Sequence, residues 1–389
     1  MRAPPTLARF SAGDALRGLS ALGVMSLHVA EFSLGSSVPI TSDVFPALRA
    51  TYGPIGLLAL AGGLSLSIFF ALSGYLISRP FAIAYVRGAA RPRAGSYTRN
   101  RLLRIVPAFW CAVLATLAVF GLSGSSPLIV PLTLGFGQVF APGSPFVTHI
   151  AQGWTLGAEV TFYALVPVVG LLSARSSTGT PAARGRRLLA LCLAIVAGTV
   201  AWRSLNPSDT TWIEVFPGVA AAFAPGIALA AAEAAWPERL ASPRSRRLAA
   251  PVALGGVALL LLAAFAPTQL TWWRWMAEAA GGGLVVAGAL LREWSGASPW
   301  KLLRNPVTVW LGHRSYSIYV LHYGIVLWLA QRLAVSGHPW ETLVRIALSA
   351  LLVTLLLADV SWRCVERPFL RLKRRRPSLV AARPSRATR

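Results

Sequence analysis

The stretch that decides the fold is PIGLLALAGGLSLSIFFALSGYLIS, which runs from Pro54 to Ser78 without a charged residue. An α-helix rises about 1.5 Å per residue, so roughly 20 apolar residues cross the ~30 Å hydrocarbon core of a bilayer. The stretch therefore predicts a membrane-spanning helix.

Similar apolar runs recur along the chain and predict an all-α, polytopic membrane bundle of about ten transmembrane helices. The runs lie near residues 12–32, 54–78, 105–123, 153–173, 187–203, 212–235, 248–266, 272–291, 315–333 and 342–362. Pro and Gly interrupt the apolar residues 128–140, which we interpret as part of an outer loop. The first run continues through Leu27 and predicts a retained helix instead of a cleaved signal peptide.

The composition agrees with a membrane protein. Hydrophobic residues make up 55% of the 389 residues and charged residues 13%, with a mean hydropathy of +0.59, whereas soluble domains carry about a quarter charged residues. Three cysteines without paired spacing (Cys111, Cys192 and Cys364) predict neither a disulfide framework nor a metal site.

The net charge of +24 could indicate nucleic-acid binding if the basic residues formed a stripe on a soluble face. They occur instead in short gaps between apolar runs, which argues against a nucleic-acid partner. With a cytoplasmic N-terminus, all the basic gaps fall on the cytoplasmic side, as in proteins of the bacterial inner membrane. These gaps are 79–104, 175–187, 239–247 and 292–314, together with the tail 363–389.

The topology places both termini in the cytoplasm. It divides the chain into a membrane domain, 1–370, and a basic tail, 371–389, which we expect to be disordered and to lie against anionic membrane lipids.

Ionisable side chains are costly inside a membrane and usually mark functional positions. Within the predicted spans they are Arg17, His28, Glu159, Glu278, His322 and Asp359.

Arg17 and His28 are eleven residues apart, so they share one helix face at a separation of ~16 Å. Glu159 is expected at the same depth as His28, where a carboxylate could orient the imidazole for acid–base chemistry. Glu278 competes for this role, and for either glutamate the alternative is a structural hydrogen bond between helices.

Arg17, Arg101 and Arg104 lie at the cytoplasmic ends of their helices. Such a cluster suits a polyphosphate ligand, although it also fits ordinary cytoplasmic loop charge.

Six segments resemble, in order, the motifs of acyltransferase family 3, the multispanning O-acyltransferases of sugars and natural products. The segments are Ala15–His28 with its Arg and His, SIFFALSGYLI at 67–77, RLLRIVP at 101–107, GWTLGAEVTFY at 153–163, SYSIYVLH at 315–322 and ERPF at 366–369. Thr155 stands where the family usually has Ser, and the hydroxyl is retained.

The resemblance implies transfer of an acyl group, expected to be acetyl, from acyl-CoA to a hydroxyl of a carbohydrate, glycolipid or glycosylated natural product. It implies no tightly bound cofactor, since acyl-CoA is a co-substrate. His28 and Glu159 would be catalytic, with a covalent acyl-imidazole as an open alternative to general-base catalysis. Arg17, Arg101 and Arg104 would hold coenzyme A. Substrate-binding positions would be Ser73, Trp154, Tyr163, Tyr316, His322 and Glu278.

Two other functional classes fit the same buried residues. A transporter of a lipid-linked sugar also needs ionisable groups at membrane depth, but the sequence shows no inverted repeat and no paired broken helices. A structural subunit of an envelope-assembly complex would leave Arg17, His28 and Glu159 dispensable.

Overall fold

The computed structural model describes residues 10–35, 44–121, 128–140, 149–173, 178–206, 214–265 and 271–373. Within these ranges the regular structure is entirely helical, which confirms the all-α prediction. Most of the predicted tail, residues 374–389, lies outside the described residues.

The long helices follow the apolar runs, and prolines at their first turns help to set where several of them begin. The long helices are α1 (Ala12–Ser33), α3 (Pro54–Leu64), α4 (Leu66–Arg87), α5 (Ala94–Phe120), α7 (Trp154–Ser173), α8 (Pro181–Leu205), α11 (Ala224–Ala235), α13 (Pro243–Phe265), α14 (Thr271–Trp294), α16 (Pro306–Leu333) and α17 (Pro339–Ser361).

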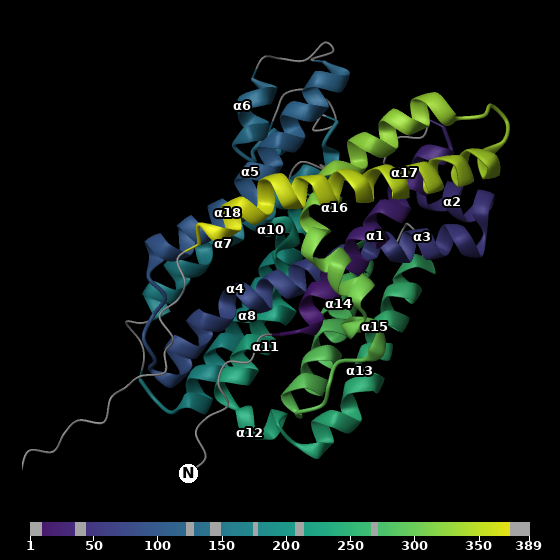
Figure 1. Cartoon of the computed structure of the whole chain (residues 1–389). Coiled ribbons are helices and arrows are strands. Elements are labelled where there is room, and N and C mark those ends of the chain that lie inside the picture. The colour runs from purple at the N-terminus through teal and green to yellow at the C-terminus, as the bar shows by residue number, and fades with distance from the viewer. Residues whose placement is uncertain are drawn as a thin grey trace, which may run out of the picture.

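Shorter helical pieces connect them. These are α2 (Val44–Tyr52), α6 (Ile129–Leu134), α10 (Phe216–Val219), α12 (Pro237–Leu240), α15 (Lys301–Arg304) and α18 (Arg367–Arg371), the 3₁₀ turns η1 (Gln138–Phe140), η3 (Ala151–Gly153) and η5 (Ala220–Ala222), and the π-helical turn η6 (Trp362–Glu366). The interrupted segment 128–140 is thus two short helical pieces. Figure 1 shows α17 and α18 as one long rod, drawn in yellow.

Six helical segments of the described chain are long and apolar enough to cross a membrane, which makes this a multi-pass membrane protein. They are Pro54–Arg87, Ala94–Phe120, Ala151–Leu172, Pro181–Leu205, Pro243–Phe265 and Pro339–Arg371. The bent pair Phe216–Ala222 and Ala224–Ala235, with an angle of 48°, makes a seventh if it counts as one span.

The other three predicted runs form α1, α14 and α16. These helices are as long as the others, but each carries buried charged side chains: Glu31 on α1, Arg274 on α14 and Arg314 on α16.

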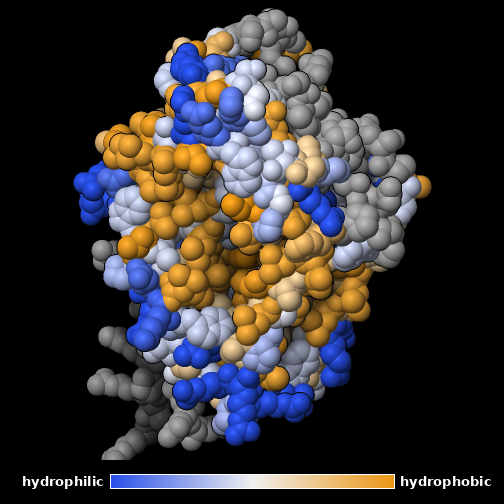
Figure 2. Space-filling model, turned by 90° about the vertical axis from the view of Figure 1, so that its right-hand side faces the viewer, coloured by the Kyte–Doolittle hydropathy of each residue, from blue (hydrophilic) through white to orange (hydrophobic). Residues whose placement is uncertain are grey.

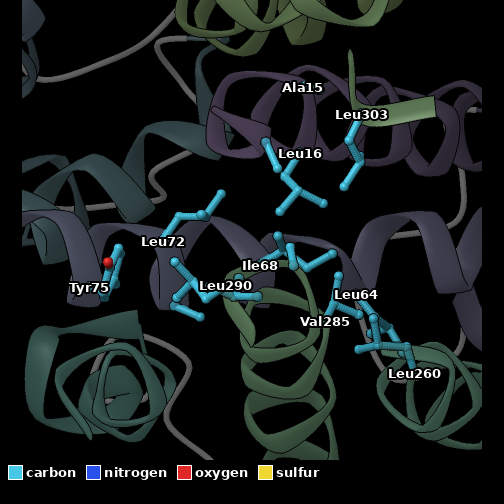
Figure 3. Close-up of a cluster of buried hydrophobic side chains, with 14 of the residues drawn as sticks. Ala15, Leu16, Leu64, Ile68, Leu72, Tyr75, Leu260, Val285, Leu290 and Leu303 are labelled. Atoms are coloured by element: carbon cyan, nitrogen blue, oxygen red, sulfur yellow. The ribbon is translucent and has the colours of Figure 1, made fainter. Parts of the chain in front are cut away.

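Glycines allow the central helices to touch backbone to backbone. A Cβ on Gly312 of α16 would lie 2.0 Å from the carbonyl oxygen of Asp14 on α1, and one on Gly226 of α11 would lie 2.0 Å from that of Ala71 on α4. Without a hydrophobic driving force between helices in lipid, such close packing is a main source of association. Figure 3 shows how side chains from α1, α4, α13 and α14 then meet in one apolar cluster, which includes Leu16, Leu72 and Val285.

Large apolar side chains are exposed on the outward faces of α5, α7, α8, α13 and α17, among them Leu114, Leu171, Leu193, Leu254 and Leu352. Figure 2 shows one face on which hydrophobic residues form a broad area, with hydrophilic residues gathered along the upper and lower margins. A soluble monomer rarely exposes so much apolar surface, whereas lipid covers it without cost.

Candidate active site

A cavity opens between α1, α4, α5, α7 and α16, and it brings together residues that lie far apart in the sequence. Its lining includes all three predicted arginines and four other predicted site residues. They are Arg17, Arg101, Arg104, Ser73, Glu159, Tyr163 and Tyr316. We call this the arginine cavity.

Aromatic rings hold one of the arginines in place. The guanidinium carbon of Arg101 lies 5.6 Å from the centre of the Tyr97 ring and 5.4 Å from that of Tyr163. Such cation–π contacts orient the guanidinium and leave its N–H groups available to a ligand. Arg17 lies 3.8 Å from Asp14, beyond the length of a strong ion pair.

Glu159 belongs to the arginine cavity. Its Oε1 atom accepts hydrogen bonds from Ser73 Oγ and from Tyr163 Oη, each at 2.5 Å. The expected pairing of Glu159 with His28 is therefore wrong, because the two hydroxyls occupy the carboxylate and another carboxylate occupies the imidazole.

That other carboxylate is Glu31, whose Oε2 lies 2.9 Å from His28 Nδ1, three residues further along α1. The side chains of His28 and Glu31 are 13% and 5% exposed, so the contact is shielded from water. Sequence reasoning missed Glu31, although the i, i+3 spacing of His28 and Glu31 was a signal for it.

His28 also stacks on His322 of α16. The ring centres are 5.4 Å apart with an interplanar angle of 30°, and Tyr323 meets the edge of the His28 ring at 5.0 Å. Sequence motifs at opposite ends of the chain thus form one pair of imidazoles.

His322 is fully buried, and its Nδ1 atom lies 3.1 Å from the Ile318 carbonyl oxygen. A carbonyl can only accept, so Nδ1 carries the proton and Nε2 of the neutral ring presents a lone pair. Among the described residues, this Nε2 atom has no hydrogen-bond partner. A buried polar atom left in this state often serves a ligand.

Tyr319 links the histidine pair to the arginine cavity. Its ring lines the cavity and lies 5.7 Å from the His322 ring, and its hydroxyl lies 2.7 Å from Thr155 Oγ1. The retained hydroxyl of Thr155 therefore has a partner at the site.

Two predicted substrate-binding residues lie elsewhere. Trp154 does not line the arginine cavity, and its ring packs 6.3 Å from Phe70. Glu278 accepts a hydrogen bond from Arg274 at 3.0 Å and lines a second cavity. The structure thus separates Glu278 from both His28 and Glu159.

The C-terminal motif reaches the site through the π-helical turn η6. It places Glu366, which is 4% exposed, 2.5 Å from Ser317 Oγ of α16. Asp359 pairs with Arg314 and Arg363 and so plays a structural part. Just beyond α18, burial together with Arg104, Arg101 and Arg17 lowers the pKa of Lys373 to about 7, so this lysine lies within the field of the three arginines.

Comparison with known proteins identifies the protein family to which a chain with this site belongs. A family described as "Acyltransferase domain" matches residues 11–363. The protein named "Putative peptidoglycan O-acetyltransferase YrhL", from Bacillus subtilis (strain 168), is 26% identical over 354 residues, covering 80% of this chain and 51% of the relative. The chain thus spans about half the length of that relative. No solved structure matches the present chain.

The family match takes in the whole arginine cavity and the histidine pair, and it confirms the resemblance found in the sequence motifs. The chain therefore belongs to this family of membrane acyltransferases.

Proposed function

We propose that the protein is an O-acyltransferase that moves an acyl group, expected to be acetyl, from acyl-CoA to a hydroxyl of a carbohydrate. The observation that carries the proposal concerns helix α1. This helix contributes Arg17 to the arginine cavity and His28 to the stacked pair of imidazoles that it forms with His322. The similarity to a protein named for peptidoglycan O-acetylation favours a glycan acceptor.

The donor fits the cavity by charge and by length. Arg17, Arg101 and Arg104 would bind the phosphates of coenzyme A, which guanidinium groups recognise through paired hydrogen bonds. Because α1 is continuous, Arg17 and His28 are ~16 Å apart along its axis, a distance that an extended pantetheine arm can cover.

The chemistry then falls to His28. His28 Nδ1 would donate its proton in a hydrogen bond to the Glu31 carboxylate. This leaves His28 Nε2 as the base that removes the proton of the acceptor hydroxyl. The oxygen attacks the thioester carbonyl, the C–S bond breaks, and the departing thiolate takes the proton from the imidazolium. His322 Nε2, with its lone pair, would accept a hydrogen bond from a neighbouring hydroxyl of the acceptor and hold the acceptor in place.

We further propose that α1, the bent pair α10–α11, α14 and α16 cross the membrane with the six clear spans. This gives ten spans with both termini in the cytoplasm, in a bacterial inner membrane. It follows from the basic gaps between the apolar runs.

The test uses purified protein in detergent, with release of coenzyme A from acetyl-CoA and calorimetric titration with coenzyme A. His28→Ala should remove turnover, by at least ~10²-fold, and leave coenzyme A binding intact. Arg17→Ala should weaken binding, and Arg17→Lys should restore part of it. His338→Ala, a change of an exposed histidine at the start of α17, is the matched control. Turnover by folded His28→Ala at the wild-type rate would refute the assignment.

A further inference from the structure

A separate cavity of ≈ 250 Å³ lies on the side of the bundle that the proposed topology assigns to the cytoplasm. Its described lining comes from the last turns of α4, the loop that follows, Gly170 near the end of α7 and Arg184 near the start of α8. We call it the Arg184 cavity. Since a single water needs only about 10–15 Å³, the cavity has room for a phosphate group with its substituents. It shares none of its described lining residues with the arginine cavity, so the proposed reaction does not use it.

Two glycines shape the Arg184 cavity. Gly88 caps the end of α4 with a φ of 66°, in the left-handed region that favours glycine, and the chain then turns so that Ala89 and Arg91 line the cavity. On the α7 side, a Cβ at Gly170 would lie 2.8 Å from the Cδ1 atom of Phe81. The absence of a side chain at Gly170 therefore lets the Phe81 ring of α4 pack against α7, and both residues form part of the wall.

Arg184 has its guanidinium fixed at the wall of the cavity. Its Nη1 atom donates a hydrogen bond to the Tyr85 carbonyl oxygen at 2.9 Å. Its buried Nε atom has no acceptor within the described ranges. The exposed Arg91 adds a second positive charge to the same cavity. Such a pair of arginines suits an oxyanion, which guanidinium groups bind through charge-assisted hydrogen bonds.

The walls of the Arg184 cavity supply no carboxylate to offset these charges. The sequence has no Asp or Glu in residues 44–158 or 160–208, which include the described lining residues and the whole connection between α7 and α8. On the neighbouring helix α11, the carboxylate of Glu233 accepts a hydrogen bond from Arg79 at 2.6 Å. Glu238 of α12 is exposed and forms no ion pair with the described residues. The anion that neutralises this cavity must therefore come from outside the chain.

Lipid-facing surface borders the Arg184 cavity. The residues on either side of Gly170 in α7, Val169 and Leu171, are exposed, and so is Leu172. The helix that carries Arg184, α8, is the least buried of the six candidate spans. A soluble phosphate could contact the arginines but not these apolar faces, whereas a phospholipid would contact both. Basic pockets between membrane helices on the cytoplasmic side are typical sites for anionic lipid head groups.

We propose that the Arg184 cavity binds the phosphate of an anionic phospholipid from the cytoplasmic leaflet. Arg184 and Arg91 bind the head group, and the acyl chains lie along the exposed apolar side chains of α7, including Leu171 and Leu172. The proposal rests on the topology and not on the acyltransferase function.

The experiment measures lipid binding by native mass spectrometry of the full chain released from detergent. The probes are phosphatidylglycerol, which is anionic, and phosphatidylcholine, which has the same phosphate and acyl chains but no net charge. The wild type should bind its first phosphatidylglycerol at least about fivefold more tightly than phosphatidylcholine. Changing both arginines, Arg91→Gln with Arg184→Gln, should reduce this preference to less than about twofold. Arg246→Gln with Arg247→Gln is the matched control, because it removes the same charge from exposed positions of α13 outside the cavity.

Equal binding of the two lipids by the wild type would overturn the proposal. An equal loss of preference in both double variants would also overturn it, because the preference would then come from general surface charge. Glycerol 3-phosphate that binds as tightly as phosphatidylglycerol would assign the cavity to a soluble phosphate instead. If the change at Arg184 destabilises the protein through the lost bond to Tyr85, the single variant Arg91→Gln decides. It should reduce the preference at least about twofold, and an unchanged preference would refute the proposal. None of these measurements uses acetyl-CoA, so their outcome is separate from that of the acyltransferase test.

Discussion

At the scale of single residues, the structure gives different partners to two glutamates, Glu159, which the sequence predicted for the site, and Glu31, which sequence reasoning missed. Glu31 contacts His28, whereas Glu159 contacts Ser73 and Tyr163 inside the arginine cavity. The Glu31 side chain is buried and that of Glu159 is partly buried in the lining of the cavity, and a carboxylate without partners at such positions would be costly. The two positions should therefore fail in kinetically distinct ways.

We expect Glu31→Gln to lower kcat by roughly ten- to a hundredfold at unchanged coenzyme A affinity, since the amide leaves the imidazole poorly oriented. Glu31→Asp should recover part of the loss. Glu159→Gln should mainly raise KM for acyl-CoA, because it disturbs the arginine cavity. Steady-state kinetics with both variants tests this, and the opposite assignment of kcat and KM effects would return the orienting role to Glu159.

Lys373 supplies a pH dependence. Its pKa is lowered to about 7 by burial and by Arg104, Arg101 and Arg17, so it is charged below pH 7 and neutral above. A polyanionic donor should thus bind more tightly at pH 6 than at pH 8. Lys373→Met should flatten this dependence, and Lys301→Met, at an exposed lysine of α15, should not. Comparing calorimetric titrations of these proteins cancels the titration of the donor's own phosphates. Equal pH dependence in Lys373→Met would contradict the expectation.

At the scale of helices, the bundle depends on points of close approach. At Gly226, a Cβ would meet the Ala71 carbonyl oxygen at 2.0 Å and the Tyr75 nitrogen at 2.5 Å, both in the backbone of α4. Gly226→Ala should therefore push α11 from α4 and destabilise the protein by about 1–3 kcal/mol. Thermal unfolding in detergent measures this. Gly198→Ala is the control, because a Cβ there meets open space, and it should be neutral or slightly stabilising.

The π-helical turn η6 makes a second prediction at this scale. Such turns insert one extra residue into a helix and often occur at functional sites. Here the turn places Glu366 beside Ser317. Deleting Cys364, an exposed residue of the turn, should restore α-helical winding, rotate Glu366 away and reduce turnover at normal expression. Cys364→Ala keeps the turn and should retain activity. Full activity of the deletion would show that the position of Glu366 is unimportant.

Much of this organisation was predictable from the sequence, and the reason is the length scale of each feature. Apolar runs report helices directly, so the ten predicted segments all appear as helices or helix pairs. The three arginines line one cavity, as expected: Arg17 lies in the first two turns of α1, and Arg101 and Arg104 lie in the first half of α5. The partners of Glu159 and Glu278 depend instead on helix rotation, which a single sequence does not encode locally. Glu31 was overlooked because an i, i+3 contact such as that between His28 and Glu31 is common on helices, so the spacing alone does not mark a functional site.

At the scale of the whole molecule, charged side chains lie in the interior and large apolar side chains lie on the surface, as expected for a protein in a bilayer. Exposed leucines lie on α5, α7, α8, α13 and α17, whereas the buried arginines, glutamates and histidine lie mainly on α1, α14 and α16. The broad hydrophobic area in Figure 2 is what a bilayer would cover. Under the proposed function, we expect the donor to enter from the side where the arginine cavity opens, which the predicted topology assigns to the cytoplasm.

This arrangement predicts which loops face the cytoplasm. In a background without the three native cysteines, single cysteines at Ala241 and Ser298 should react with an impermeant thiol reagent only after the membrane is opened. A cysteine at Ser336, between α16 and α17, should react in intact cells. All three positions are exposed, so a lack of labelling reflects the membrane and not burial in the protein. Because α13 and α14 lie between Ala241 and Ser298, both should report the same side only if α14 crosses the membrane despite Arg274 and Glu278. Labelling of Ser298 from outside would remove α14 from the spans and overturn the ten-helix topology.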